Sequence, residues 1–318
     1  MTQIAVKVLR RTQEALDIAS YELGKPDGSA LPGFSAGSHI DVQVPGGLTR
    51  QYSLCNDAAE QHRYRIAVLR DPSSRGGSST MHDHVHEGDT LLISEPRNHF
   101  PLVHGERALL FAGGIGVTPL LCMAQRLSTI GADFTLHYCT RSAERTAFRE
   151  EIAASPWKDR VKFHFDDGPP SQKLQLERVI AKPEPGTHLY ICGPTGFIDW
   201  VVKTADGFGW PKDRVHLEYF GAAAQDTGGD RPFQVKIASS GAVVEVAARQ
   251  TIVQALQQHG IEILTSCEQG VCGTCITRVL QGECDHRDLY FTDEEKAKHD
   301  QFTPCCSRAK SPLLVLDL

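Results

Sequence analysis

The chain has 318 residues, a formal net charge of −6 at pH 7 and a pI near 6.2. An acidic chain without a run of Lys and Arg offers no phosphate-binding stripe, so nucleic acid is not an expected partner. The longest uncharged stretch, between Ala108 and Arg126, is short for a membrane span and contains three glycines and a proline, so no membrane partner is expected either. The length predicts two or three domains.

The first residues carry no continuous apolar run of the kind that a secretory signal contains. Ten cysteines in such a chain are better explained as metal ligands and buried thiols than as disulfides. We therefore expect a cytoplasmic protein.

Residues 1–103 show the pattern of an antiparallel β domain. Side chains alternate in character along His39–Val44 and Tyr64–Leu69, as they do in strands with one buried face. Turn-forming residues separate such runs, for example at Ser73–Ser79. The segment is predicted to form a small antiparallel β-barrel.

Between residues 104 and 225, apolar strand candidates alternate with helical stretches, which predicts a doubly wound α/β domain with a parallel sheet covered on both faces. The expected strands are Ala108–Ala112, Phe134–Cys139, Val161–Phe165, His188–Cys192 and Val215–Tyr219. The expected helices are Pro119–Ser128, Thr146–Ala154, Leu174–Lys182 and Thr195–Asp206.

A stretch without apolar periodicity, Gly221–Pro232, is interpreted as a linker to a third domain at residues 226–318. In that domain Phe233–Ile237 and Ala242–Val246 predict a hairpin. The segment Thr251–His259 predicts a helix that is capped by its first residue and ended by the glycine that follows it.

The third domain carries the most specific motif of the chain. Cys267, Cys272, Cys275 and Cys305 have the spacing C-x4-C-x2-C-x29-C, which is the ligand layout of a plant-type [2Fe–2S] cluster. A structural zinc site would show two C-x2-C pairs or added histidines, and a redox C-x-x-C would stand beside a βαβ pattern. Both alternatives fit the spacing less well. Cys306 is the rival for the fourth ligand, and the spacing favours Cys305.

Two motifs of the first domain together favour a flavin phosphate site. Arg50 ends a β segment and can pair with a phosphate, while Tyr52 and Ser53 offer a ring and a hydroxyl to a flat ligand. In Arg75–Thr80, paired glycines free backbone N–H groups and three hydroxyls add donors. The alternative for either motif alone is an ordinary surface segment.

Two motifs of the second domain favour a dinucleotide site. Gly113–Pro119 follows an apolar strand and opens a helix, but Pro119 stands where the third glycine of the usual fingerprint would be. Cys192–Pro194 closes a later strand at the sheet edge where open α/β sheets bind ligands. A tight strand–helix turn without a ligand is the alternative.

With these motifs in this order, the chain resembles the phthalate dioxygenase reductase type of flavin–iron–sulfur reductase, which includes the vanillate demethylase reductases. The resemblance covers the entire length and implies a flavin barrel, a nicotinamide domain and a C-terminal β-grasp ferredoxin domain. It also implies FMN, NADH and a [2Fe–2S] cluster as cofactors. At the last ligand the family reads Cys-Val-Ser-Arg, where this chain has Cys305–Arg308 with a second cysteine in place of the valine.

The resemblance also implies which residues contact the cofactors. The residues expected to hold FMN are Arg50, Gln51, Tyr52, Ser53, Ala67, Val68, Leu69, Arg75, Gly76, Gly77 and Ser78. The residues expected to frame the nicotinamide are Gly114, Thr118, Pro119, Cys192, Gly193 and Pro194. Thr118, Cys192 and Phe220 are expected beside the reacting rings, with Phe220 covering the flavin.

The implied function is that of the reductase component of a multicomponent Rieske-type oxygenase, either ring-hydroxylating or O-demethylating. Electrons would pass from NADH to FMN, then to the cluster and on to the oxygenase. The main alternative is a reductase for a cytochrome P450 or another one-electron acceptor; a ferredoxin-like carrier without enzyme activity and a zinc-dependent binding module are the others. Arg141 could meet a 2′-phosphate, so the choice of NADH over NADPH rests on the resemblance. A monomer is the expected state.

Overall fold

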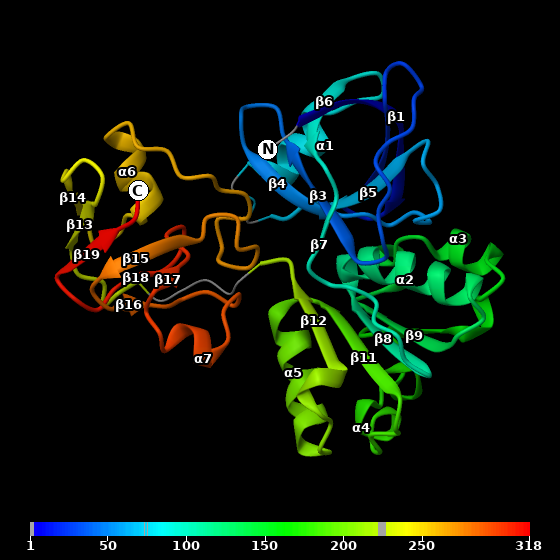
Figure 1. Ribbon diagram of the computed structural model, residues 1–318. Coiled ribbons are helices and arrows are strands. Elements are labelled where there is room, and N and C mark those ends of the chain that lie inside the picture. The colour runs from blue at the N-terminus through cyan, green and yellow to red at the C-terminus, as the bar shows by residue number, and fades with distance from the viewer. Residues whose placement is uncertain (1–2, 73, 75, 222–226) are drawn as a thin grey trace. The chain divides into compact units, whose positions relative to one another are not determined.

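The computed structural model describes residues 3–72, 74, 76–221 and 227–318. The chain divides into two compact units, Met1–Phe220 and Gly221–Leu318. The first unit holds an antiparallel and a parallel sheet, while the second holds a mixed sheet and a two-stranded sheet (Figure 1). Within the described ranges, no helix is both long enough and apolar enough to cross a bilayer.

The antiparallel sheet of the first unit forms the predicted barrel. Its strands are β1 (Gln3–Ala15), β2 (Ile18–Gly24), β3 (Ser38–Gln43), β4 (Thr49–Ser53), β5 (Tyr64–Leu69), β6 (Thr90–Ser94) and β7 (Arg97–Asn98). They pair in the order β4-β3-β6-β1-β2-β5, with β7 on β3. The Cys55 N–H, just after β4, donates to the Arg65 carbonyl on β5 at 2.9 Å and so joins the two ends of this order. Ile40 and Ile66 lie in the barrel core.

One expected turn of the barrel domain contains a helix. Helix α1 (Gly77–His84) begins inside the predicted turn Ser73–Ser79, directly after Gly76, whose φ of 99° suits glycine. Residues 73 and 75 lie outside the described part of the chain. The Tyr21 hydroxyl donates to the Met81 carbonyl at 2.7 Å. This anchor explains why a segment rich in glycine and serine becomes helical.

The parallel sheet has the predicted doubly wound form. Its strands are β8 (Arg107–Gly113), β9 (Asp133–Thr140), β10 (Val161–Phe165), β11 (Thr187–Gly193) and β12 (Val215–Tyr219), in the order β10-β9-β8-β11-β12. Leu110 packs in one apolar cluster with α2 (Val117–Thr129), and Leu109 packs in another with α5 (Thr195–Gly207). Successive residues of β8 therefore face opposite layers of helix, as expected for a sheet covered on both faces.

Two helices of this layer are shorter than expected. They are α3 (Arg149–Ala154) and α4 (Leu176–Val179), and the single 3₁₀ turns are η1 (Gly114–Gly116), η2 (Ala143–Arg145), η3 (Lys158–Arg160), η4 (Pro170–Gln172) and η5 (Lys212–Arg214). The Thr146 hydroxyl bonds the Thr140 hydroxyl at 2.6 Å, and Phe148 has a φ of 61°. These tertiary constraints hold the start of the expected helix Thr146–Ala154 out of helical geometry.

The second unit has a β-grasp arrangement. The sheet order is β14 (Val243–Val246), β13 (Phe233–Ile237), β19 (Leu313–Leu316), β15 (Thr277–Gln281) and β17 (Gln301–Phe302), while β16 (Cys284–Asp285) pairs with β18 (Arg308–Ala309). Helix α6 (Ile252–Gln258) packs on this sheet, and the short α7 (Asp293–Lys296) follows β16. Thr251 caps α6 through a reciprocal pair of bonds with Gln254, as predicted for this cap. The predicted hairpin is formed by β13 and β14.

Two pairs of histidines bridge neighbouring strands of the parallel sheet. His137 Nδ1 lies 3.0 Å from His164 Nε2, and His188 Nδ1 lies 2.9 Å from His216 Nε2. Two neutral imidazoles can share one N–H···N bond, whereas two cations would repel each other. Burial, and then the neighbouring His164, lowers the pKa of His137 to about 3. The sheet therefore holds His137 in its neutral form.

The sheet should lose stability in mild acid. The folded pKa of His137 lies below the unfolded value near 6.5, so the unfolded chain binds the extra proton and stability falls as pH drops below about 6.5. At pH 5 this group alone should cost about 2 kcal/mol of unfolding free energy relative to neutral pH. The three tryptophans, Trp157, Trp200 and Trp210, all lie in the first unit, so urea unfolding followed by tryptophan fluorescence reports on it.

The matched variants are His137→Phe, which removes the buried group, and His104→Gln, which replaces an exposed histidine. The first should reduce the pH dependence, leaving the part that other buried histidines such as His39 contribute, and the second should leave it unchanged. An unfolding midpoint that is equally pH-dependent in the wild type and in His137→Phe would exclude this role for His137.

Candidate functional site

Four cysteine thiols converge in the second unit. Cys267, Cys272 and Cys275 lie on the irregular segment between α6 and β15, and Cys305 follows β17. The Cys267 thiol interacts with the thiols of Cys272 and Cys305, and Cys305 also reaches Cys275. These contacts lower the pKa of Cys267 and raise the pKa of Cys305. Residues that are distant in sequence thus place four sulfurs around one point.

The surroundings of these sulfurs fit a [2Fe–2S] cluster. Backbone N–H groups of Gln269 and Thr274 donate to the sulfurs of Cys267 and Cys272, each at 3.4 Å. Such hydrogen bonds to cysteine sulfur tune the potential of iron–sulfur centres. Cys305 is 5 % exposed, so the site is largely shielded from water. A set of four sulfur donors with N–H groups aimed at them is the donor set that two irons need.

Two glycines make the cysteine segment possible. Gly270 has a φ of 73° and Gly273 a φ of 70°, which side chains rarely adopt. A Cβ on Gly270 would lie 2.4 Å from the Cys306 sulfur, and a Cβ on Gly273 would lie 2.4 Å from the Tyr290 ring. Both positions therefore lack backbone freedom and space for any larger residue.

Cys306 has different neighbours from Cys305. The Cys306 sulfur lies 3.3 Å from the Thr303 hydroxyl and 3.8 Å from the Ser307 hydroxyl. Contact with Cys305 comes first among the causes that lower the pKa of Cys306 to about 7. The structure brings Cys305, and not Cys306, into contact with two of the other three cysteines.

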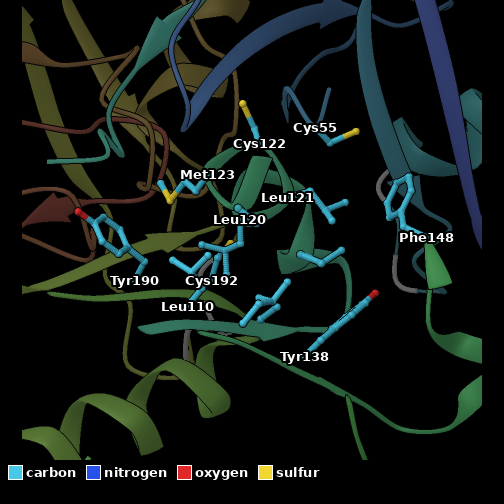
Figure 2. Close-up of a cluster of buried hydrophobic side chains, with 14 of the residues drawn as sticks. Cys55, Leu110, Leu120, Leu121, Cys122, Met123, Tyr138, Phe148, Tyr190 and Cys192 are labelled. Atoms are coloured by element: carbon cyan, nitrogen blue, oxygen red, sulfur yellow. The ribbon is translucent and has the colours of Figure 1, made fainter. Parts of the chain in front are cut away.

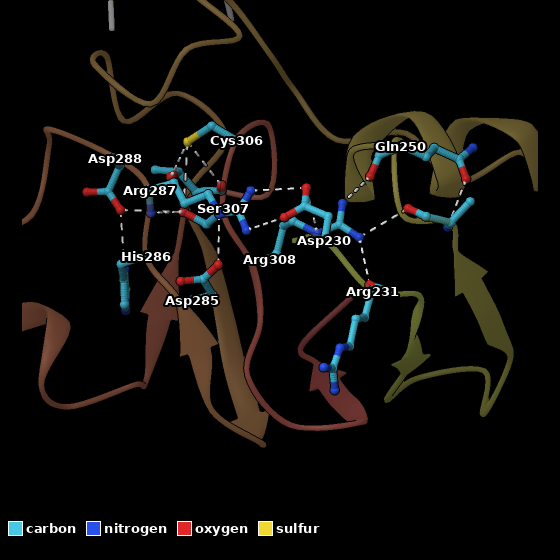
Figure 3. Close-up of polar contacts among 12 residues, drawn as sticks. Asp230, Arg231, Gln250, Asp285, His286, Arg287, Asp288, Cys306, Ser307 and Arg308 are labelled. Atoms are coloured by element: carbon cyan, nitrogen blue, oxygen red, sulfur yellow. Dashed lines mark hydrogen bonds and ion pairs between the residues drawn. The ribbon is translucent and has the colours of Figure 1, made fainter. Parts of the chain in front are cut away.

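A polar network around Arg308 fixes the segment that carries Cys305 (Figure 3). The Arg308 guanidinium donates to the backbone carbonyls of Gln250, Arg231 and Ala247 at 2.7–3.1 Å. Asp230 lies 3.5 Å from the same guanidinium. The bonds join the end of the predicted linker Gly221–Pro232 to the cysteine domain, while residues 222–226 of that linker lie outside the described ranges. Sequence reasoning missed this network, because isolated charges carry no pattern.

In the first unit, the structure brings Arg50 to the start of α1. A Cβ on Gly77 would lie 2.7 Å from Arg50 Nε, so the guanidinium stem rests on the helix N-terminus. The Ser78 hydroxyl accepts from the Asp71 N–H at 3.2 Å. A cation beside the N-terminus of a helix is the arrangement that a phosphate requires. Arg75, the other predicted cation, lies outside the described residues.

The remaining flavin candidates line the neighbouring strands. Gln51 Nε2 lies 3.4 Å from His39 Nε2, and burial raises the pKa of Tyr52. On β5, Ala67 and Val68 are buried and Leu69 is partly buried. The predicted flavin contacts are therefore adjacent on β4, β5 and α1.

The glycine turns after β8 and β11 meet at the point where the strand order reverses. A Cβ on Gly116 would lie 2.2 Å from the Cys192 carbonyl oxygen, and one on Gly113 would lie 3.0 Å from Pro194 Cδ. Open α/β sheets bind nucleotides at this switch point. The Thr118 hydroxyl donates to the Ile115 carbonyl at 3.0 Å and holds the first turn of α2.

The Cys192 side chain is fully buried (Figure 2). It lies in the apolar cluster that includes Leu110, Leu120 and Tyr190. Burial, and then the charge of Glu218, raises the pKa of its thiol well above the usual value. A thiol that stays neutral is a poor nucleophile, so Cys192 contributes apolar packing beneath the switch point.

Glu218 is a candidate that sequence reasoning missed. It lies on β12 opposite Cys192, and it accepts a hydrogen bond from the Ser53 hydroxyl at 3.3 Å. Burial raises its pKa to about 8. A perturbed carboxyl that joins the barrel to the switch point is a candidate functional group. Phe220, two residues further on, is 40 % exposed.

None of the ten cysteines, all of which lie in the described part of the chain, forms a disulfide.

Comparison with known proteins gives the same picture. Residues 235–310 match the 2Fe-2S iron-sulfur cluster binding domain, and residues 97–215 match the N-terminal domain of dimethylamine monooxygenase subunit DmmA-like proteins. The vanillate O-demethylase oxidoreductase of Pseudomonas sp. (strain HR199 / DSM 7063) is 54 % identical over all of both chains.

Solved structures also match nearly the entire chain. Phthalate dioxygenase reductase, described as a modular structure for electron transfer from pyridine nucleotides to [2Fe–2S], is 42 % identical with a TM-score of 0.81 and covers 99 % of this chain and 98 % of its own. An intact type IV self-sufficient cytochrome P450 monooxygenase is 38 % identical with a TM-score of 0.82, and the match spans 99 % of this chain and 41 % of the monooxygenase.

The fold and the cysteine site define a modular oxidoreductase with a C-terminal [2Fe–2S] ferredoxin domain. The chain belongs to the phthalate dioxygenase reductase family, which includes the vanillate O-demethylase oxidoreductases. The predicted family and the predicted fold class are both confirmed.

Replacing Gly270 by alanine should reduce the iron and acid-labile sulfide bound per chain, because the new methyl group displaces Cys306 and the adjoining Cys305. Gly260 has the same φ of 73° but no atom within 4 Å of its Cβ position, so Gly260→Ala is a matched control for backbone strain alone. We expect Gly270→Ala to lose most of its iron and Gly260→Ala to keep it. Equal iron contents in the two variants would show that the clash at Gly270 is unimportant.

Proposed function

We propose that the chain is the reductase component of a multicomponent Rieske-type oxygenase that hydroxylates aromatic rings or removes O-methyl groups. The proposal is supported by three features that occur together in one chain. They are a barrel whose helix N-terminus suits a phosphate, a sheet edge of the kind that binds nucleotides, and four converging thiols. Relatives that match nearly the entire chain are named vanillate O-demethylase oxidoreductase and phthalate dioxygenase reductase. The electron acceptor is a separate oxygenase, which docks transiently on the ferredoxin domain.

The cofactors in this proposal are NADH, FMN and the [2Fe–2S] cluster. The flavin, when bound, converts a two-electron hydride into single electrons that a [2Fe–2S] centre can accept. Arg50 and the start of α1 hold the FMN phosphate, while Gln51, Tyr52, Ser53 and Ala67–Leu69 line the isoalloxazine. Phe220 covers that ring.

The switch point orients the nicotinamide. Gly114, Gly193 and Pro194 leave room for the dinucleotide, and Thr118 and Pro119 fix the start of α2 beneath it. The neutral thiol of Cys192 and the carboxyl of Glu218 exclude water from the floor. Cys267, Cys272, Cys275 and Cys305 hold the cluster.

We further propose the domain borders 1–103, 104–225 and 226–318, a monomeric state and a cytoplasmic location. The separate sheets support the borders.

A second candidate acceptor is a cytochrome P450. The similarity to 41 % of the chain of a self-sufficient cytochrome P450 monooxygenase supports it. Mixing the purified chain with either a vanillate O-demethylase oxygenase or a P450, and following NADH oxidation coupled to product, separates the two. Turnover with the P450 alone would overturn the oxygenase assignment.

Replacing Arg50 by glutamine should weaken FMN binding roughly 10- to 100-fold, because the phosphate loses a charge-assisted hydrogen bond. Riboflavin has no phosphate, so its affinity should be nearly unchanged. Arg70→Gln, which removes an exposed cation that pairs with Asp83, is the control. Flavin fluorescence on titration measures all three. A loss of affinity that is equal for FMN and riboflavin would place Arg50 away from the phosphate.

Replacing Cys305 by serine should abolish the cluster while leaving NADH-dependent reduction of a two-electron dye within about twofold, because the flavin lies upstream of the cluster. Reduction of cytochrome c should fall at least roughly tenfold, because it needs single electrons. Cys306→Ser should keep both activities and the iron. Visible spectra, iron analysis and both assays test the order of cofactors. Loss of dye reduction in a folded Cys305→Ser protein would contradict it.

A further inference from the structure

A second group of metal-ligating side chains lies in the ferredoxin domain, apart from the four cluster cysteines. Cys284 on β16, His286 just after it and His299 just before β17 each offer one ligand atom, and these atoms lie within 4.8 Å of one another. Thiolate and imidazole are the ligands that zinc and similar divalent ions prefer.

His286 is held in the state that a metal requires. Its side chain is 6 % exposed, and Nδ1 lies 3.2 Å from the fully buried carboxylate of Asp288 (Figure 3). The carboxylate fixes the ring proton on Nδ1 and leaves the lone pair of Nε2 available. His286 Nε2 is buried and has no hydrogen-bond partner. A carboxylate behind a histidine is also the usual support of a metal ligand.

The carboxylate of Asp288 is not free to move. It accepts from the backbone N–H groups of Tyr290 and Phe291 at 3.1 and 2.8 Å. Lys296 Nζ lies 4.0 Å from it and donates to the Asp288 carbonyl at 2.8 Å. The orientation of the His286 ring is therefore fixed before any ligand binds.

Cys284 and His299 complete the group. Cys284 is fully buried. His299 has a φ of 53°, an uncommon conformation for a residue other than glycine, and its ring centroid lies 5.9 Å from that of His286. Strained backbone of this kind is often retained where it positions a functional side chain.

We propose that Cys284, His286 and His299 form a second metal site, which binds one Zn²⁺ with a water molecule as the fourth ligand. On binding, the Cys284 thiol releases its proton to solvent and becomes a thiolate, and His299 Nδ1 exchanges the hydrogen bond that it accepts from the Cys284 N–H at 3.3 Å for the metal. No electron is transferred. The ion ties β16 to the segment before β17. It acts independently of the cluster and of the proposed function.

The test uses the purified holoprotein, exchanged into buffer without chelator, with zinc and iron measured together by mass spectrometry after equilibration with Zn²⁺ and desalting. We expect one zinc per chain in addition to the two irons of the cluster. Cys284→Ala and His286→Ala should bind zinc at least roughly tenfold more weakly, as is typical when a ligand is removed, and should keep their iron and dye reduction. His259→Ala, which removes an exposed histidine of the same unit, is the control.

A second variant guards against misfolding. His299→Asn keeps a residue type that tolerates a positive φ and removes the imidazole, so Zn²⁺ should raise the melting temperature of the wild type and not of this variant. Zinc that rises only as iron falls, or zinc that is unchanged in Cys284→Ala, would assign the ion to the cluster cysteines and overturn the proposal. No retained zinc in the wild type would also overturn it.

Discussion

The ferredoxin domain depends on charged groups that are largely shielded from water and must therefore find partners within the protein. Arg308 satisfies three backbone carbonyls and faces Asp230, and Asp230 in turn bonds Arg287 at 2.6 Å. The Arg287 guanidinium lowers the pKa of Asp230, so the pair remains ionised. Removing one partner of a buried pair is costly, because the other charge is left without compensation. This requirement ties the start of the domain to the segment that follows Cys305.

The same network explains how a ligand distant in sequence can reach the cysteine segment. The Ser307 hydroxyl accepts from the Arg287 N–H at 3.2 Å and lies 3.5 Å from the Asp288 carboxylate. Ser307 directly follows Cys306, so these bonds fix the backbone just beyond the fourth sulfur. The left-handed glycines act on the other side, where they let the segment around Cys272 fold tightly. Neither the polar contacts of Ser307 nor the left-handed glycines alone would bring four sulfurs together.

In the first unit, the proposed flavin and nicotinamide sites share a boundary. The barrel supplies Ser53 and the parallel sheet supplies Glu218, and these side chains meet directly. The glycines at 113 and 116 permit the turns after β8 and β11 to touch. An edge with bare backbone and neutral groups suits a nicotinamide, because it excludes water without adding a competing charge.

The sequence by itself determined the family, the three-part architecture and the positions of most strands. Period-two alternation marked β3 and β5, the strand–helix alternation marked the parallel sheet, and the spacing of the cysteines marked the cluster segment. These signals can be read from the sequence because they are local or have a fixed spacing. The shortened helix α3 and the helical start of α1 were not predictable, since Thr140 and Tyr21 impose them from distant strands.

Only the tertiary structure showed Glu218 beside Ser53, the Arg308 network and the group of Cys284, His286 and His299. In the sequence, the C-x2-C pair is the feature that a zinc site would share. Cys284, His286 and His299 lie on two segments without a recognisable spacing. Contacts of this kind produce no periodic pattern in the sequence, because the folded chain determines which residues meet. The sequence determined which cofactors the chain can hold, and the tertiary structure decided which charges and thiols surround them, because burial and contact exist only once the chain has folded.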